Sequence, residues 1–524
     1  MKKVAIVLAL VVLASCSFHD PEREPRHVAD PGRCTPVDIA VAPETFSVVD
    51  SLARAFNGSA AAKLRGGCAF VRTLNMESAT AMNRLAQGWP NAHFDGPAPT
   101  AWIPASTAWG MLLDSLHGSA RATTGTSLAT VPTVVAVAAP DLHLLPSNPT
   151  WNDVARLRLG KANPYFSTSA LLATLAVRDA TTTKAVEQSV VYYGASSTAF
   201  LANWLHVQTE GGAPSDATAV IADARAVRAY NLGSARGLLP VHGKKHPKDA
   251  LVPLTPVGGI PDADNPILVL DAPWSSAVAR AGAQAFTTFV TTATARQKFT
   301  KAGFGPPRNS TFTEADLLQA LDQWSRLRRP ARVRLLVDVS DSMGDIPSRA
   351  FSVSKLALTR TALLHALDTP GLFGADDQVG LRIFATKLPG GADWRDVVPM
   401  APYPQVKANL IGAINGLATA AGSPLYAAAQ DTFETAQHTS EPGAINAVVL
   451  LTDGYNEVSG PPSRSQLLTL VAKTPRVRVF TIALGSGADT DTLRRMSQDS
   501  DAVFYDASAA ASLPDAVAAA LANF

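Results

Sequence analysis

Residues 331–344 read ARVRLLVDVSDSMG, an apolar run that ends in closely spaced polar side chains. The run from Val333 to Val337 predicts a buried strand. Asp338, Ser340 and Ser342 follow it with D-x-S-x-S spacing, so one carboxylate and two hydroxyls can converge from a single loop. Because ligands of open parallel α/β sheets bind beyond the carboxyl ends of the strands, this loop is a candidate binding site.

Two later segments bring further oxygen atoms to the same edge of the predicted sheet. Residues 422–426 (GSPLY) offer the Ser423 hydroxyl just before a helix, and the apolar strand at 447–451 is followed by Asp453. Carboxylate and hydroxyl oxygens are hard donors that suit Mg²⁺. The sequence therefore predicts one divalent-cation site formed by three separate loops.

In order and approximate spacing, these segments resemble the metal-ion-dependent adhesion site of von Willebrand factor A (VWA) domains. The resemblance covers residues 331–524 and implies a doubly wound, Rossmann-like α/β domain with a central, mostly parallel sheet. It implies that the three serines contact the metal directly, and that Asp338 and Asp453 do so directly or through water. The expected ion is Mg²⁺, with Mn²⁺ or Ca²⁺ as alternatives, and the expected partner is a protein that offers Asp or Glu to it.

Ser423 departs from the usual pattern of this family. Thr is the usual residue in that loop, and Ser keeps the hydroxyl but lacks the methyl group that restricts χ1. We therefore expect coordination with weaker affinity. An A-type fold that no longer binds metal is the alternative.

Residues 35–310 alternate short apolar strands with helices, which predicts α/β architecture with parallel sheets covered on both faces. Five segments resemble bacterial extracellular solute-binding proteins of the two-lobed, type II periplasmic kind. They are residues 37–44 (VDIAVAPE), 99–106 (PTAWIPAS), 163–172 (NPYFSTSALL), 251–256 followed by 266–274, and the closing helix at 285–304. The resemblance implies a small solute bound in a cleft between two lobes.

Candidate solute contacts in this domain stand at predicted helix starts and strand ends. Ser167, Thr168 and Ser169 would place hydroxyls and free N–H groups at a helix N-terminus, where an anion is favoured. Ser78 and Thr80 would do the same in the first lobe, and Trp102 would stack on a sugar. Ordinary N-capping, and core packing for the tryptophan, are the alternatives.

The two predicted domains are joined by residues 311–330. Residues 313–326 form an amphipathic pattern and predict a connector helix, and Pro330 interrupts any continuation of it. The side chains expected on its apolar face are Leu317, Leu318, Leu321 and Trp324.

The first residues predict export and anchoring. A basic start and the apolar run 4–13 form a secretory signal, and Leu13-Ala14-Ser15-Cys16 resembles the cleavage box of bacterial lipoproteins. The resemblance implies removal of residues 1–15, a lipid on Cys16 and a polar tether over 16–34. A plain signal peptide cleaved elsewhere, or a short membrane anchor, remains the alternative.

The remaining cysteines, Cys34 and Cys68, form an even pair in an exported chain. An oxidising compartment favours a disulfide between them, and two buried thiols are the alternative.

The composition and the absence of several sequence motifs limit the functions that are expected. A net charge of +2 gives no bulk field for nucleic acid. No phosphate loop, HExxH, CxxC or G-x-S-x-G motif is present, so an enzyme is not expected. Three classes remain: a lipid-anchored adhesion or scaffold protein on the outer face of the cell membrane, a solute receptor of a transport system, and an envelope sensor. The specificity of the cation motif favours the first.

Overall fold

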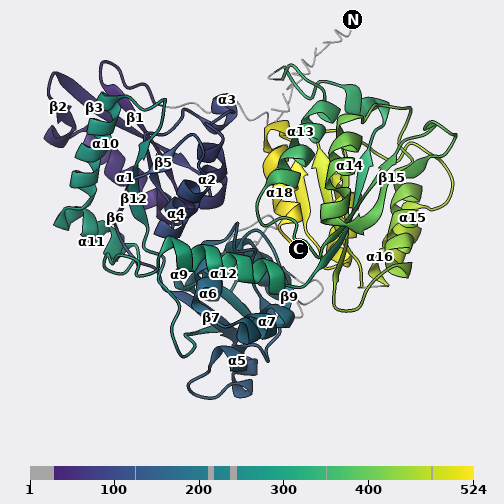
Figure 1. Cartoon of the computed structure of the whole chain (residues 1–524), viewed down its shortest axis with the longest axis horizontal. Coiled ribbons are helices and arrows are strands. Elements are labelled where there is room, and N and C mark those ends of the chain that lie inside the picture. The colour runs from purple at the N-terminus through teal and green to yellow at the C-terminus, as the bar shows by residue number, and fades with distance from the viewer. Residues whose placement is uncertain (1–28, 124, 211–216, 236–244, 350, 474–475) are drawn as a thin grey trace, which may run out of the picture.

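The structure is a computed structural model, and it describes residues 29–123, 125–210, 217–235, 245–349, 351–473 and 476–524 of the 524-residue chain. The signal segment and Cys16 lie outside the described residues. Three α/β bodies follow one another (Figure 1): a first lobe, a second lobe and a C-terminal domain. No helix among the described residues is both long and apolar enough to span a bilayer.

Lobe 1 is built on a seven-stranded sheet in the order β2-β3-β1-β4-β12-β5, with β6 paired to β12. The strands are β1 (Thr35–Val41), β2 (Lys63–Leu64), β3 (Gly67–Asn75), β4 (Ala101–Ile103), β5 (Arg121–Ala122), β6 (Thr126–Ser127) and β12 (Pro266–Asp271). Its helices are α1 (Pro43–Asn57), α2 (Ser78–Ala86), α3 (Ala92–Asp95), α4 (Thr107–Ser115), α10 (Ala277–Val290) and α11 (Ala293–Lys301). The Cys34–Cys68 disulfide is present, with 4.7 Å between the Cα atoms, and joins the start of β1 to the start of β3.

Lobe 2 has a five-stranded sheet in the order β11-β7-β10-β8-β9. The strands are β7 (Thr133–Ala138), β8 (Leu159–Gly160), β9 (Val190–Tyr192), β10 (Ala219–Asp223) and β11 (Leu251–Leu254). Its helices are α5 (Trp151–Val154), α6 (Thr168–Ala176), α7 (Ala180–Ser189), α8 (Ser197–Glu210) and α9 (Ala224–Asn231). The chain enters this lobe after Val131 and leaves it before Ala263, and these two residues pair as an isolated antiparallel bridge between the lobes.

The expectation of purely parallel sheets in this region needs one correction. β10 and β11 run antiparallel to β7, and β12 runs antiparallel to β4. β7 and β12 are the strands that directly follow the two crossings between the lobes, and each runs antiparallel to the neighbours that it meets in its sheet. The periodicity of apolar residues predicts a strand but not the direction in which it runs relative to its neighbours.

The connector contains α12 (Glu314–Leu327), which is packed rather than free. A capping box between Thr313 and Asp316 starts the helix. The Trp324 indole Nε1–H donates to Glu187 Oε2 of α7 at 3.1 Å, and α12 also contacts α6 and α4. One expected apolar side chain is misplaced: Leu318 is 41% exposed, because it lies at the margin of the stripe formed by Leu317, Leu321 and Trp324.

The C-terminal domain has a six-stranded sheet in the order β15-β14-β13-β16-β17-β18, in which only β15 is antiparallel to its neighbour. The strands are β13 (Ala331–Asp338), β14 (Gln378–Phe384), β15 (Trp394–Pro402), β16 (Ile445–Thr452), β17 (Arg478–Leu484) and β18 (Phe504–Ala507). The helices are α13 (Lys355–Asp368), α14 (Tyr403–Asn415), α15 (Leu425–His438), α16 (Arg464–Ala472), α17 (Thr490–Asp499) and α18 (Leu513–Leu521). Helices α13, α14 and α18 pack together on one face, and α15, α16 and α17 on the other.

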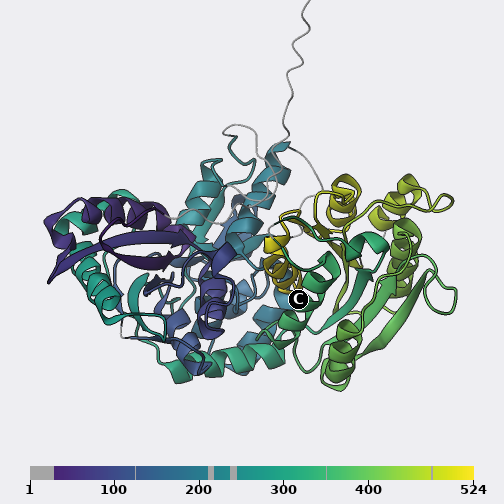
Figure 2. The same ribbon diagram turned by 90° about the horizontal axis from the view of Figure 1, so that it is seen from above.

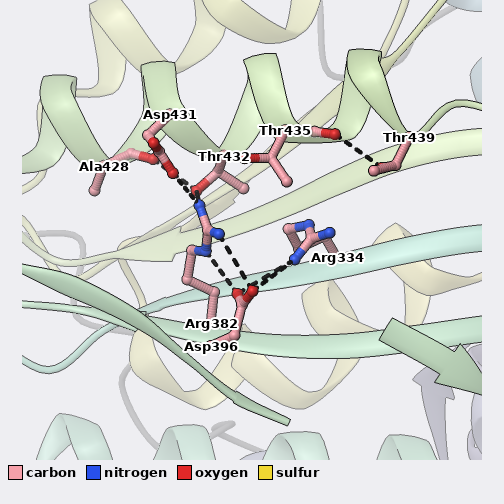
Figure 3. A network of polar contacts seen from close by, with 8 residues as sticks. All are labelled: Arg334, Arg382, Asp396, Ala428, Asp431, Thr432, Thr435 and Thr439. Carbon is pink, nitrogen blue, oxygen red and sulfur yellow. Dashed lines mark hydrogen bonds and ion pairs between the residues drawn. The ribbon is translucent and has the colours of Figure 1, made fainter. Parts of the chain in front are cut away.

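A charged network ties the antiparallel edge strand to this sheet (Figure 3). Arg382 of β14 donates through Nε to Asp396 of β15 at 2.7 Å and also pairs with Asp431 of α15. Arg334 of β13 donates to Asp396 at 3.2 Å. The network explains the arginine inside the apolar run of β13, since its side chain is buried with an anionic partner.

The C-terminal domain contacts both lobes and lies beside them when viewed from above (Figure 2). Arg478 of β17 donates to the carbonyl of Val191 in lobe 2. On the other side, Arg84 of α2 pairs with Asp515 of α18 at 3.2 Å. The rings of Phe94 in α3 and Phe351, in the loop before α13, are stacked with centroids 5.0 Å apart.

Candidate functional site

The candidate cation site lies at the carboxyl edge of the C-terminal sheet. β13 ends at Asp338, and its parallel neighbour β16 ends at Thr452 with Asp453 directly after it. Val337 pairs with Leu451 in this register, so the two aspartates emerge at the same edge. Ser423 arrives from the loop before α15.

The five oxygen-bearing side chains expected from the sequence lie together in the structure. The Ser340 and Ser342 Oγ atoms are 3.2 Å apart, and Ser342 Oγ donates to Asp453 Oδ1 at 2.8 Å. Ser423 Oγ donates to Asp338 Oδ2 at 3.2 Å. The backbone N–H of Ser340 donates to Asp338 Oδ1 at 2.8 Å and holds that carboxylate in place.

These spacings fit a small octahedral cation. Oxygen ligands about 2.1 Å from Mg²⁺ lie about 3.0 Å from their neighbours around the ion. The oxygen–oxygen distances of 2.8 and 3.2 Å in the structure bracket that value. Across the described parts of the chain, no group of three His, Cys, Asp or Glu side chains is placed to hold a metal. The site thus relies on two carboxylates with hydroxyls, a donor set that suits a hard ion.

Burial makes a charge on Asp338 costly. The residue has no exposed surface, and burial raises the pKa of its carboxyl to about 6. Hydrogen bonds from Ser340 and Thr452 oppose that rise in pKa, while the nearby charge of Asp453 adds to it. A cation at this edge would favour the ionised form.

Three neighbours of the site were not expected from the sequence. Lys355, the first residue of α13, donates from Nζ to Asp453 Oδ2 at 2.7 Å and to the Ser342 carbonyl at 3.3 Å. Thr452 Oγ1 donates to Asp338 Oδ2 at 2.5 Å, and Glu457 Oε2 accepts from the Ser423 N–H at 3.1 Å. Thr452 is signalled by its place before Asp453, whereas no local spacing points to Lys355.

Exposed apolar side chains lie on the two loops that also carry Ser340, Ser342 and Asp453. Four large ones stand on the two loops that follow β13 and β16, with exposed fractions of 56% for Ile346, 43% for Val353, 59% for Tyr455 and 38% for Val458. Exposed apolar surface grouped around a polar centre is typical of an interaction surface.

A second candidate site is a cavity of about 40 Å³ between the two lobes. Of the residues expected to contact a solute, Ser78, Ser167, Thr168 and Ser169 line this cavity. Thr80 lines a neighbouring cavity of about 240 Å³ where both lobes meet the C-terminal domain. Trp102 has no exposed surface within β4, a position that corresponds to the core-packing alternative.

The serine hydroxyls at the start of α6 are engaged with one another and with α8. Ser167 and Ser169 lie 3.2 Å apart between their Oγ atoms, and Ser197 Oγ lies 3.3 and 3.0 Å from them. Ser167 occupies the N-cap position of α6, but its side chain makes no capping hydrogen bond. Ser167 and Ser169 therefore bridge two helices of lobe 2 rather than cap one.

Comparison with known families identifies both domains. Residues 37–305 match the model of the bacterial extracellular solute-binding proteins, and residues 333–519 match that of the von Willebrand factor type A domain. Since the first match spans more than half of the chain, the protein belongs to the bacterial extracellular solute-binding proteins and carries a VWA domain after that module. The two-domain prediction is confirmed. A comparison with curated proteins finds no significant match.

Several solved structures resemble parts of the chain. A von Willebrand factor type A protein from Catenulispora acidiphila is 20% identical, with 37% of this chain and 43% of that chain covered and a TM-score of 0.28. The sulfate-binding protein SubI from Mycobacterium tuberculosis H37Rv is 18% identical, with 55% and 91% covered and a TM-score of 0.36. Proximal thread matrix protein 1 from the mussel byssus, with a zinc-occupied MIDAS motif, is 20% identical, with 42% and 54% covered and a TM-score of 0.27. This chain spans about half the length of the first such structures that it matches.

Proposed function

We propose that this protein is a lipid-anchored, extracytoplasmic binding protein rather than an enzyme. Its VWA domain would bind one divalent cation, Mg²⁺ by preference, and through that ion an Asp or Glu of a protein partner. The observation that carries the proposal is the convergence of five oxygen-bearing side chains from three loops, with contacts of 3.2 Å for Ser340–Ser342, 2.8 Å for Ser342–Asp453 and 3.2 Å for Ser423–Asp338.

The chemistry of the ligand set supports recognition through a shared ion. Two carboxylates and three hydroxyls leave room in the coordination shell of a hard cation for water or for an external oxygen. A carboxylate from a partner is the strongest such donor a protein can offer. The apolar side chains around the site, Tyr455 and Ile346 foremost, would add contact area to that single bond.

The proposal of a lipid anchor is based on the sequence of the first sixteen residues. The basic and apolar segments followed by Leu13-Ala14-Ser15-Cys16 support lipidation of Cys16. A diacylglyceryl group holds a protein stably where a single acyl chain does not. Membership of the extracellular solute-binding proteins and the Cys34–Cys68 disulfide agree with an oxidising compartment outside the cytoplasm.

A Mn²⁺ experiment on the full chain tests the shared-ion mechanism. N-acetylaspartate amide would be titrated into the Mn²⁺-loaded protein while water-proton relaxation is followed, with N-acetylasparagine amide as the matched neutral control. The expected result is displacement of metal-bound water by the carboxylate alone. Equal binding of both compounds, or binding of the carboxylate that persists undiminished in excess EDTA, would overturn the mechanism.

A second candidate function is that of a solute receptor for a transport or sensing system, with the VWA domain as its docking module. The enclosed cavity between the lobes favours it, because both lobes contribute to the wall. A thermal-shift screen separates the two functions: a solute that stabilises the two-lobed domain supports the receptor, whereas a response to Mg²⁺ or Mn²⁺ alone supports adhesion.

A further inference from the structure

The cavity between the lobes is acidic. Glu44 lies in the first turn of α1 and Glu77 directly precedes α2, both in lobe 1, while Asp223 ends β10 in lobe 2. All three line the cavity, and none of the described residues that line it is Lys, Arg or His. The three residues therefore bring carboxyl groups from both lobes to one shared space, in which Glu44 Oε2 is buried.

Arg225 carries a guanidinium that acts electrostatically on two of these carboxylates, but its hydrogen bond goes to a backbone carbonyl. Arg225, in the first turn of α9, influences both Glu44 and Asp223 electrostatically. Its Nη1 donates to the backbone carbonyl of Glu44 at 2.9 Å, and its Cζ lies 3.9 Å from the ring centroid of Phe304. Arg225 therefore anchors lobe 2 to lobe 1 beside the cavity.

The walls also present acceptors that have no donor. Asn265 and Thr133 are only 1% and 2% exposed, and within the described part of the chain Asn265 Oδ1 and Thr133 Oγ1 have no hydrogen-bond partner. The orientation of the Asn265 amide is fixed, because its Nδ2 donates to the carbonyls of Ala129 and Ala263 at 3.2 and 3.1 Å. Glu44 Oε2 is unpartnered as well. Asn265 Oδ1 can only accept, and Thr133 Oγ1 can accept as well as donate, so this lining favours a ligand that donates hydrogen bonds.

A comparison of two electrostatic energies disfavours the binding of an oxyanion in this cavity. The N-terminus of α6 would stabilise an anion by about 1 kcal/mol, and by at most about 2 kcal/mol. One carboxylate about 6 Å away would repel a unit negative charge by about 3 kcal/mol at an effective dielectric constant of 20. Glu77 and Asp223 line the same cavity beside Glu44, and one ionised carboxylate is enough to outweigh the helix terminus. This reverses the anion preference expected for Ser167, Thr168 and Ser169.

The acidic groups that line the cavity lie close enough together to disfavour one another's ionised forms. Burial, which is the largest cause, and the charges of Glu77 and Asp223 together raise the pKa of Glu44 to about 8. Burial also raises the pKa of Glu77 and of Asp223. A positive charge in the cavity would relieve this repulsion.

We propose that the cleft of this protein binds a compact organic cation, a protonated amine whose N–H groups donate to Glu44, Asn265 and the facing carboxylates. The inference rests on the solute-receptor function and names its ligand class. An ammonium group carries several donors and no acceptor, which matches this lining.

The volume of the cavity and the placement of its carboxylates limit the class of ligand that it can bind. A cavity of about 40 Å³ holds a small group rather than a sugar or a peptide side chain with its backbone. The three carboxylates reach the cavity from two lobes, and no basic side chain lies among its described lining residues. The carboxylates are spread around the cavity as a cage, which suits a polyatomic cation.

The test uses the full chain with its VWA domain. Thermal shift and calorimetry would be run with methylammonium, ethanolamine and putrescine, and with sulfate and phosphate, each against sodium chloride of equal ionic strength. The expected result is stabilisation by at least one amine and by neither oxyanion. Glu44→Gln combined with Glu77→Gln should weaken amine binding at least tenfold.

Asp271→Asn is the matched control, since Asp271 is an exposed carboxylate of lobe 1 outside the cavity, and it should leave amine binding unchanged. Stabilisation by sulfate or phosphate that survives in the double variant would overturn the cation assignment while leaving the receptor function standing. No response to any amine or oxyanion would overturn both. Binding of Mg²⁺ to the same sample reports the VWA site independently.

Discussion

Replacing Lys355 with methionine removes a cation that lies against the expected metal ligands. The ammonium Nζ is 2.7 Å from Asp453 Oδ2, and the two side chains are 14% and 0% exposed. At an effective dielectric constant of 20, the direct attraction across that distance is about 6 kcal/mol. Desolvation of both groups offsets most of this, so the net contribution is about 1 to 2 kcal/mol. A divalent ion must displace the ammonium from Asp453 or bind against its repulsion.

Lys355→Met should therefore change two quantities in opposite directions. The metal-free protein should lose stability, because the Asp453 carboxylate stays buried without its partner. The affinity for Mg²⁺ should rise by about 5- to 30-fold, the equivalent of 1 to 2 kcal/mol. Chemical denaturation in EDTA measures the first quantity and isothermal calorimetry the second. Unchanged or weaker Mg²⁺ binding in this variant would refute the view that Lys355 competes with the ion.

Three further outcomes are expected. Replacing Cys34 and Cys68 with serine should lower the free energy of unfolding by about 3 to 4 kcal/mol, since the disulfide closes a loop with a sequence separation of 34; equal denaturation midpoints for the variant and the oxidised wild type would contradict this. Arg382→Met should lower the free energy of unfolding by about 1 to 3 kcal/mol, because its buried guanidinium pairs with two carboxylates. Arg326→Met breaks an exposed ion pair and should lower it by less than about 0.5 kcal/mol. Similar losses in both variants would argue against a stabilising role of the network. Burial raises the pKa of Glu44 from 4.5 to about 8, so the folded protein binds that proton more tightly than the unfolded chain and loses stability as pH rises through this window. Glu44→Gln should thus match the wild type at about pH 4 and exceed its stability by about 2 kcal/mol at about pH 9, as followed by urea denaturation; a constant difference across pH would contradict that assignment.

The cation site was accessible to sequence analysis because each part is a local pattern. An apolar strand followed by polar residues places Asp338 and Asp453 at strand ends, and parallel strands share one carboxyl edge. Lys355 was missed because its contact depends on how the start of α13 packs over that edge, and no spacing encodes this. The strand β15 was missed as well, since its alternation is irregular and its pairing depends on the buried arginine network.

The cleft was harder to interpret from sequence. Ser167 and Ser169 were placed correctly at a helix start, yet their hydroxyls bond to Ser197 of another helix. The charge of the cavity comes from Glu44 and Glu77 of lobe 1 and Asp223 of lobe 2, which are far apart in the chain and are brought together by the tertiary fold. Charge assembled from distant residues is invisible to local patterns.

The central claim, that five side chains from three loops hold one divalent cation, is tested most directly by calorimetry of Mg²⁺ binding to matched variants. Asp453→Asn removes a carboxylate of the site, whereas Asp341→Asn removes an exposed carboxylate from the same D-x-S-x-S loop without touching the five. One Mg²⁺ per chain should bind to the wild type and to Asp341→Asn with affinities within about threefold, while Asp453→Asn should lose at least about 100-fold, the equivalent of 2.7 kcal/mol. Equal losses in the two variants, or full binding in Asp453→Asn, would contradict the account.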